Sequence, residues 1–130
     1  MILRVGLGYD IHPLVEGETL VLGGVVIPHH KGLQGHSDGD ALCHAIMDSL
    51  LGAGGLPDIG TFFPPGDSSY RKIRSILLLK EVCRMLRNRG WEIQNIDSTI
   101  IAEQPRVAPF VPEMKREIAQ AMGVTIDTVG

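Results

Sequence analysis

Asp10 and His12 are the residues whose types and spacing most directly suggest metal chemistry. They stand two apart at the end of an expected strand over residues 2–8, so both side chains point to the same face. His44 lies one turn after Asp40, on the polar face of an expected helix. Two imidazoles and one carboxylate suit Zn²⁺, and three protein ligands leave a fourth position for substrate or water.

Neither part of this cluster identifies a metal site alone. An Asp-x-His pair is a weak signal, and a lone histidine is more often a surface residue or one with its hydrogen bonds satisfied. Together, at the ends of elements and beside acidic neighbours, Asp10, His12 and His44 favour a shared site.

Two further segments contain residues that could bind a ligand. In His36-Ser37-Asp38-Gly39-Asp40, two side-chain donors precede a helix whose first amides favour an anion, although spacing alone favours an ordinary helix cap. Asp58-Ile59-Gly60 places a carboxylate in a Gly- and Pro-rich loop, where it could accept hydrogen bonds from a polyol or act only as a turn residue.

Composition excludes several classes of function. The 130 residues carry a net charge of −3 without a basic stripe, which argues against non-specific nucleic-acid binding. Cys43 and Cys83 each stand alone among apolar residues, so we expect buried free thiols. No apolar stretch approaches the roughly 20 residues that span a bilayer, and the N-terminus does not resemble a signal peptide. We therefore expect a cytoplasmic protein without a membrane partner.

The first half of the chain shows a hairpin and a helix. Residues 20–22 and 25–27 flank Gly23-Gly24, a strong hairpin signal, and residues 29–35 read as loop. A helix is expected from Ser37, with Asp40 as its capping-box partner, and residues 56–67 are expected to form an extended loop.

The second half alternates in the same way. We expect a helix over residues 70–89, a strand over 91–103, a third helix ending at Met122-Gly123, and a further strand beginning near Val124. Strands interleaved with helices indicate an α/β or α+β sandwich. We favour an α+β fold, a two-layer sandwich in which three helices cover one face of a mixed sheet.

Several motifs in order resemble the 2-C-methyl-D-erythritol 2,4-cyclodiphosphate synthase family. The resemblance runs from residue 3 to the end, and several motifs in the right order and spacing are highly specific. The motifs are Gly8-Tyr9-Asp10-Ile11-His12, Gly23-Gly24-Val25-x-Ile27-Pro28, Lys31-Gly32-Leu33, His36-Ser37-Asp38-Gly39-Asp40 with His44, Asp58-Ile59-Gly60 with Phe63-Pro64, and Ile100-Ile101-Ala102 with Pro105.

This resemblance implies an enzyme of non-mevalonate isoprenoid biosynthesis. It would cyclise 4-diphosphocytidyl-2-C-methyl-D-erythritol 2-phosphate to the 2,4-cyclodiphosphate and release CMP. It implies a homotrimer with active sites between subunits and zinc on Asp10, His12 and His44. A second divalent ion, Mg²⁺ or Mn²⁺, would bridge the diphosphate.

The resemblance also implies roles for other residues. His36 and Ser37 would contact phosphate, with His36 positioning it in the transition state, and the Asp58-Ile59-Gly60 segment would bind the polyol hydroxyls. The cytidine pocket, supplied by the adjacent subunit, would consist of Ala102, Pro105, Arg106, Val107 and Ala108.

Two departures from the family pattern leave alternatives open. Pro65 stands where many relatives carry an acidic residue. Residues 1–130 are expected to form one catalytic domain without the family's C-terminal strand, which carries a Lys-Ala-Thr-Thr-Thr-Glu run, and a true fragment is expected to be inactive. The alternatives to the cyclase are a zinc-dependent phosphohydrolase and an inactive trimer that binds phosphorylated isoprenoids.

Overall fold

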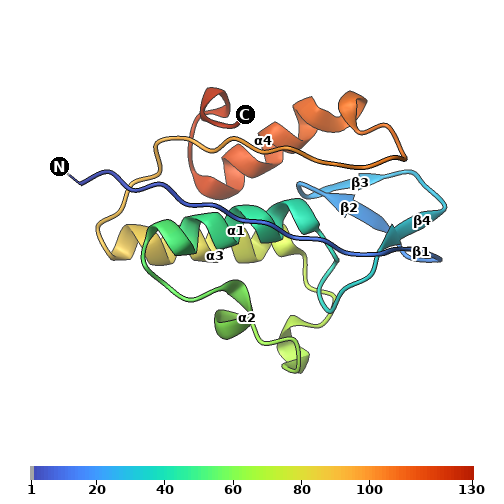
Figure 1. The fold of residues 1–130 in the computed structure, drawn as a ribbon, viewed down its shortest axis with the longest axis horizontal. Coiled ribbons are helices and arrows are strands. Elements are labelled where there is room, and N and C mark those ends of the chain that lie inside the picture. Colours follow the sequence, from blue (N-terminus) through green and yellow to red (C-terminus); the bar gives the residue numbers. More distant parts are fainter. Residues whose placement is uncertain (1) are drawn as a thin grey trace.

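Four α-helices and two short antiparallel sheets make up residues 2–130, the part of the chain described by the computed structural model (Figure 1). Met1, the first residue of the expected domain, lies outside the described residues. The strands are β1 (Leu14–Glu16), β2 (Leu20–Leu22), β3 (Val25–Ile27) and β4 (Lys31–Leu33), and the α-helices are α1 (Ala41–Ala53), α2 (Ile59–Phe62), α3 (Ser75–Asn88) and α4 (Val111–Met122). Short 3-10 turns are η1 (Ser68–Tyr70), η2 (Ala108–Phe110) and η3 (Ile126–Thr128).

The class is α+β, but the expected single mixed sheet under three helices is wrong. Within the described residues, β1 pairs with β4 and β2 pairs with β3, both antiparallel, so there are two sheets. The strand β4 falls in a stretch expected to be loop, and α2 falls in another. These elements are three or four residues long, which is too short to show a periodic pattern.

The long extended segments explain the missing sheet. Residues 2–8 and 91–103, both expected to be strands, are extended but belong to neither sheet, and the parallel bridge between Ile96 and Val129 is the single isolated bridge in residues 2–130. A β-pattern predicts a conformation, whereas a sheet also requires a partner edge. The strand expected near Val124 is instead the turn η3, and the helix expected over 70–89 begins only at Ser75, as α3, after the turn η1.

The hairpin of β2 and β3 is confirmed, and a buried carboxylate holds it against α1. Gly23 and Gly24 have φ of 59° and 77°, as this tight turn requires. The Asp40 carboxylate is fully buried and accepts hydrogen bonds from the amides of Gly23, Gly24 and Cys43 at 2.9, 2.8 and 3.0 Å. Asp40 is therefore the N-cap of α1, and the expected start of the helix at Ser37 is wrong.

The extended chain before β1 lies directly on α1 (Figure 1). A Cβ atom built at Gly6 would lie 1.8 Å from the carbonyl oxygen of Ser49, and one at Gly8 would lie 1.8 Å from that of Ala45. Side chains at even positions therefore face the helix, whereas Val5, Leu7, Tyr9 and Ile11 are 75–92% exposed.

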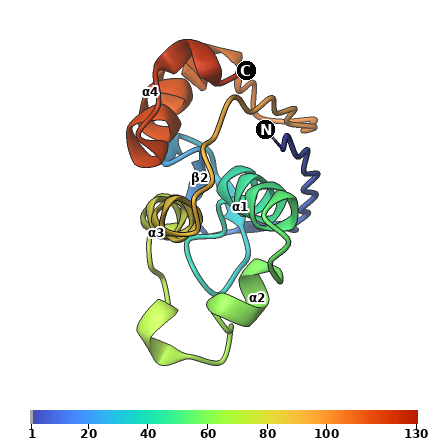
Figure 2. The same ribbon diagram turned by 90° about the vertical axis from the view of Figure 1, so that its left-hand side faces the viewer.

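One hydrophobic cluster joins the helices and the hairpin. Helix α3 packs against both α1 and α4, and Figure 2 views α1 and α3 nearly end-on between α4 and α2. The end of α4 is confirmed, because Gly123 takes the left-handed conformation that closes it. Cys43 and Cys83 are fully buried free thiols, as expected. Among the described residues, no helix has both the length and the apolar character needed to cross a membrane.

The different surroundings of Gly8 and Gly52 predict opposite effects on stability when each is replaced by alanine. Gly8→Ala places a methyl group on the Ala45 carbonyl and should lower the free energy of unfolding by about 1–3 kcal/mol. Gly52→Ala, within α1, meets no atom within 4 Å and should raise it by about 0.5–1 kcal/mol. Urea denaturation measures both. A Gly8→Ala chain as stable as the wild type would show that the segment is not held on the helix.

Candidate metal centre

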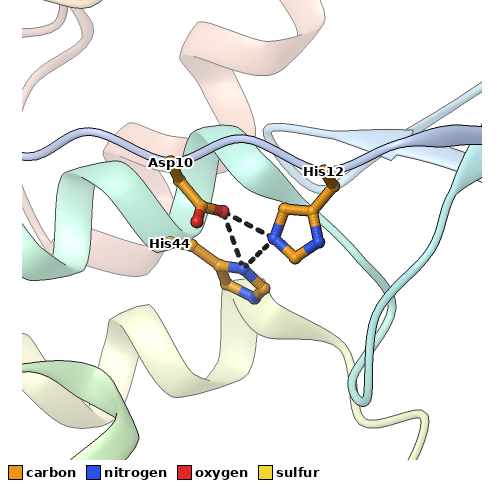
Figure 3. Close-up of side chains that lie close together, drawn as sticks. All are labelled: Asp10, His12 and His44. Carbon is orange, nitrogen blue, oxygen red and sulfur yellow. Dashed lines mark hydrogen bonds and ion pairs between the residues drawn. The ribbon is translucent and has the colours of Figure 1, made fainter.

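Three ligand atoms from distant parts of the sequence converge at one point (Figure 3). Oδ2 of Asp10 lies 2.7 Å from Nε2 of His12 and 3.2 Å from Nδ1 of His44, and the two nitrogens are 3.3 Å apart. Two elements position them: the extended chain places Asp10 and His12 on its helix-facing side, and α1 presents His44 from its first turn. The sequence predicted this grouping, and the structure brings the three side chains together.

The spacing and chemistry of these atoms fit a tetrahedral cation. Ligand atoms about 2.0–2.1 Å from a Zn²⁺ ion lie about 3.3–3.4 Å from one another, close to the two longer edges of this triangle. Two neutral imidazole nitrogens and a carboxylate oxygen facing one another are all electron-pair donors, and a shared cation relieves their mutual repulsion. The Asp10–His12–His44 group can therefore hold a metal ion.

Hydrogen bonds behind the histidines orient both rings. Nδ1 of His12 lies 2.6 Å from the carbonyl oxygen of Gln34, which can only accept, so Nδ1 carries the proton and Nε2 is free to bind metal. Nε2 of His44 lies 2.8 Å from Oγ of Ser75 and 3.1 Å from Oγ of Ser37. The imidazole of His44 is thus held from behind, with Nδ1 turned toward the cluster.

His44 is more buried than the sequence indicated. We expected it on a polar helix face directed away from the core, yet its side chain is only 11% exposed and Asp40 on the same face is fully buried. The side chains of His12 and Asp10 are 18% and 25% exposed. Partial burial raises the pKa of Asp10, but the neighbouring side chains of His44 and His12 outweigh this effect and hold the pKa of the carboxyl below its usual value.

A cavity of about 260 Å³ opens beside the three ligands. His36 and Ser37 line it from the loop before α1, Ile59 and Gly60 line it from α2, and Pro65 lines it as well. These residues surround the cluster on one side, which leaves room for a small polar ligand. The structure therefore places His36, Ser37, Ile59 and Gly60 with Asp10, His12 and His44 around one space.

Asp58 does not line this cavity. It is the N-cap of α2, and one carboxylate oxygen accepts hydrogen bonds from both the amide and the hydroxyl of Thr61. A second carboxylate, that of Asp48 on α1, accepts the amide of Ile59 at 3.0 Å and fixes α2 beside the cavity. Sequence reasoning gave Asp48 no role in the site.

The segment expected to bind cytidine lies elsewhere. It lies on the α4 side of the molecule, away from α2 (Figure 1), and α2 contributes Ile59 and Gly60 to the lining of the cavity. No residue of this segment lines the cavity, and most of its side chains are exposed; its members are Ala102, Pro105, Arg106, Val107 and Ala108. Within a single chain, the segment 102–108 therefore lies apart from Asp10, His12 and His44.

Ser75 and Asp38 are site residues that sequence reasoning did not assign. Ser75 opens α3 and touches His44, and Asp38 accepts hydrogen bonds from both the hydroxyl and the amide of Ser75. Neither residue has a spacing that links it to His44, because the contact joins two helices separated by a loop. Ser37, assigned as a phosphate contact or a cap, also touches His44.

Known proteins are similar to this chain over nearly its whole length. The YgbB family model matches residues 3–130. A 2-C-methyl-D-erythritol 2,4-cyclodiphosphate synthase from Syntrophomonas wolfei is 54% identical over 127 residues, which cover 98% of this chain and 81% of that protein.

Solved structures show the same similarity. The CDP-bound form of a 2C-methyl-D-erythritol-2,4-cyclodiphosphate synthase superposes with a TM-score of 0.86 at 36% identity, covering 98% of this chain and 85% of that one. The bifunctional IspDF of Campylobacter jejuni superposes with a TM-score of 0.93 at 36% identity, and this chain spans 34% of its length. The chain belongs to the YgbB family.

Proposed function

We propose that this chain is a 2-C-methyl-D-erythritol 2,4-cyclodiphosphate synthase. It converts 4-diphosphocytidyl-2-C-methyl-D-erythritol 2-phosphate into the cyclic 2,4-diphosphate with release of CMP, a phosphorus–oxygen lyase reaction of non-mevalonate isoprenoid biosynthesis in the cytoplasm. The observation that carries the proposal is the 54% identity to a synthase of that name over 98% of the chain. The convergence of Asp10, His12 and His44 beside a cavity supports it.

The proposed cofactors follow from the donor set. Asp10, His12 and His44 hold Zn²⁺, because two nitrogen donors and one oxygen donor match its preference. A second divalent ion, Mg²⁺ or Mn²⁺, accompanies the diphosphate of the substrate. When bound, these ions neutralise phosphate charge as it is brought together for reaction.

The proposed chemistry requires positioning more than a protein nucleophile. An oxygen of the substrate's own 2-phosphate bonds to the β-phosphorus, the bond from that phosphorus to the CMP oxygen breaks, and CMP leaves with the electron pair. Such oriented intramolecular attack can contribute about 7–11 kcal/mol of barrier reduction. The thiols suit no nucleophilic role, since burial raises the pKa of Cys83 to about 11 and that of Cys43 well above its usual value.

Each remaining cavity residue has a proposed role in holding the substrate. His36 and Ser37 contact phosphate oxygens, with His36 positioning them in the transition state. Ile59 and Gly60 form the wall beside the polyol. Asp58 does not line the cavity but caps the helix α2 that forms this wall, and its free oxygen accepts from the polyol hydroxyl groups. The ring of His36 is held in place from one side, because its Nε2 lies 3.0 Å from the carbonyl oxygen of Asp67 and donates a hydrogen bond to it.

A homotrimer with shared sites explains two features of the single chain. The outward-facing side chains of Val5, Leu7, Tyr9 and Ile11 form an exposed apolar row, and the side chain of Ile101 is 92% exposed as well. Such a surface is typical of a subunit interface. The cytidine segment 102–108 lies apart from its own cavity, so it serves the cavity of a neighbouring copy. A CDP-bound structural relative supports a cytidine nucleotide as the ligand.

Removal of one imidazole tests the metal site. His44→Ala should abolish stoichiometric zinc binding and CMP release while leaving the oligomer folded, because two ligands hold Zn²⁺ far more weakly than three. Zinc content after dialysis, circular dichroism and gel filtration measure these properties. His30→Ala is the matched control, since His30 is exposed and contacts only Glu16 at 3.5 Å among acidic groups. Full zinc content in His44→Ala would refute the assignment.

The reaction products separate the proposal from its alternatives. With the diphosphocytidyl substrate and Mg²⁺, the full chain should release one CMP per cyclic diphosphate and no inorganic phosphate, as ³¹P NMR and chromatography record. Treatment with EDTA should stop the reaction, and added Zn²⁺ with Mg²⁺ should restore it. Inorganic phosphate from simple phosphate esters would indicate the phosphohydrolase, and binding without turnover would indicate the inactive trimer.

Mixed trimers test the shared site. Asp10→Ala lacks the metal ligand and Ala102→Glu places a charge in the cytidine segment, so each variant alone should be inactive. Random co-assembly of the two after refolding should restore about a quarter of wild-type activity, because a cavity and a neighbouring segment are both intact with that frequency. Absence of any recovery, with mixed oligomers verified by mass spectrometry, would contradict a site shared between copies.

A further inference from the structure

A chain of polar side chains runs away from the metal cluster into the protein. Nδ1 of His44 faces Asp10 and His12, and Nε2 on the opposite side of the ring lies 2.8 Å from Oγ of Ser75. Ser75 is fully buried, and its hydroxyl lies 2.6 Å from Oδ1 of Asp38. The three groups thus form a line from carboxylate through hydroxyl to imidazole.

The direction of each hydrogen bond follows from what each group can donate. An ionised carboxylate only accepts, so the hydroxyl proton of Ser75 goes to Asp38. A serine has one hydroxyl proton, which leaves the oxygen of Ser75 to accept from Nε2 of His44. His44 must then carry its proton on Nε2, and the lone pair of Nδ1 points toward Asp10 and His12.

Asp38 is itself held rigidly. Its Oδ2 accepts the amide of Ser75 at 3.0 Å, and its Oδ1 also accepts the amide of Asp40 at 3.1 Å. The backbone amide of Asp38 donates to the carbonyl of Ile73, and that of Lys72 donates to the carbonyl of His36. These bonds join the loop before α1 to the loop before α3, so Ser75 has little freedom to turn its hydroxyl elsewhere.

Ser37 provides the other hydroxyl near His44, but it is less suited to determine which ring nitrogen of His44 carries the proton. Its Oγ lies 3.1 Å from Nε2 of His44, farther than that of Ser75, and it lines the cavity. Its hydroxyl lies 3.0 Å from Oγ of Ser75, and no carboxylate in the described residues orients its proton. Ser37 is therefore free to turn toward a bound anion, while Ser75 keeps its contact with the ring.

We infer that Ser75 and Asp38 are positioning residues for the metal ligand His44, since the Asp38–Ser75–His44 chain selects the ring tautomer whose Nδ1 lone pair faces the metal position. The inference rests on the metal site of the proposed function. Hydrogen-bond partners of metal-bound histidines commonly alter metal affinity by about 10–100-fold when removed. Asp38 and Ser75 act through His44 and touch no reacting atom.

The experiment reads both the tautomer and the metal affinity. In metal-free wild type labelled with ¹⁵N-histidine, at mildly alkaline pH where imidazoles are neutral, long-range ¹H–¹⁵N spectra should show His44 protonated on Nε2. In Ser75→Ala the His44 signals should shift toward a mixture of tautomers, and zinc affinity in chelator competition should fall about 10–100-fold. Ser49→Ala removes a hydroxyl that, within residues 2–130, donates its hydrogen bond to the Ile46 carbonyl and lies outside the Asp38–Ser75–His44 chain, so this variant should match the wild type in both.

Two results would overturn the positioning role. One is His44 protonated on Nδ1 in the metal-free wild type, a measurement that needs no variant. The other is wild-type zinc affinity in Ser75→Ala. Failure of the proposed function looks different, because a wild-type chain that binds zinc with the Nε2-protonated form of His44 but releases no CMP would disprove the cyclase and leave the role of Ser75 standing.

Discussion

The contact between the extended chain at residues 6–12 and the backbone of α1 is the constraint on which the metal cluster depends. Gly6 and Gly8 leave no side chain between the two backbones, so Asp10 and His12, on the same side of the extended chain, arrive beside His44. A side chain at either glycine would push Asp10 and His12 away from His44, and metal coordination tolerates errors of only about 0.2 Å in such distances. The close packing of the extended chain on α1 therefore also sets the geometry of the Asp10–His12–His44 group.

Two carboxylates with several hydrogen-bond donors each, the buried Asp40 and the half-buried Asp38, organise the other side of the site. Asp40 joins the hairpin turn to α1 through three amides, and Asp38 joins the loops before α1 and α3 through backbone and hydroxyl donors. Burial raises the pKa of Asp40, and its hydrogen bonds from backbone amides oppose that effect. Charge is thus buried only where donors surround it, and the loop from residue 36 to 40 is rigid because both of its aspartates are satisfied.

The surface of the chain indicates how a complete site would be divided among copies in the proposed trimer. One copy contributes the ligands, His36, Ser37 and the α2 wall, all around one cavity. The apolar row on the N-terminal segment is exposed in the single chain, and the segment 102–108 does not line the cavity of its own chain. In this arrangement, association both covers apolar surface and supplies the nucleotide pocket, so assembly and activity share one interface.

Local sequence determined the hairpin at Gly23-Gly24, the end of α4 at Gly123, the buried thiols and the Asp10–His12 pair, because each depends on neighbours in the chain. Only the tertiary structure decided that Asp40 also binds the hairpin turn, that His44 is buried and that Ser75 stands behind it. These outcomes depend on partners brought together by folding from distant segments, and no periodic pattern encodes them. The expected strands failed for the same reason: residues 2–8 and 91–103 specify an extended backbone, but a sheet forms only where another edge lies alongside.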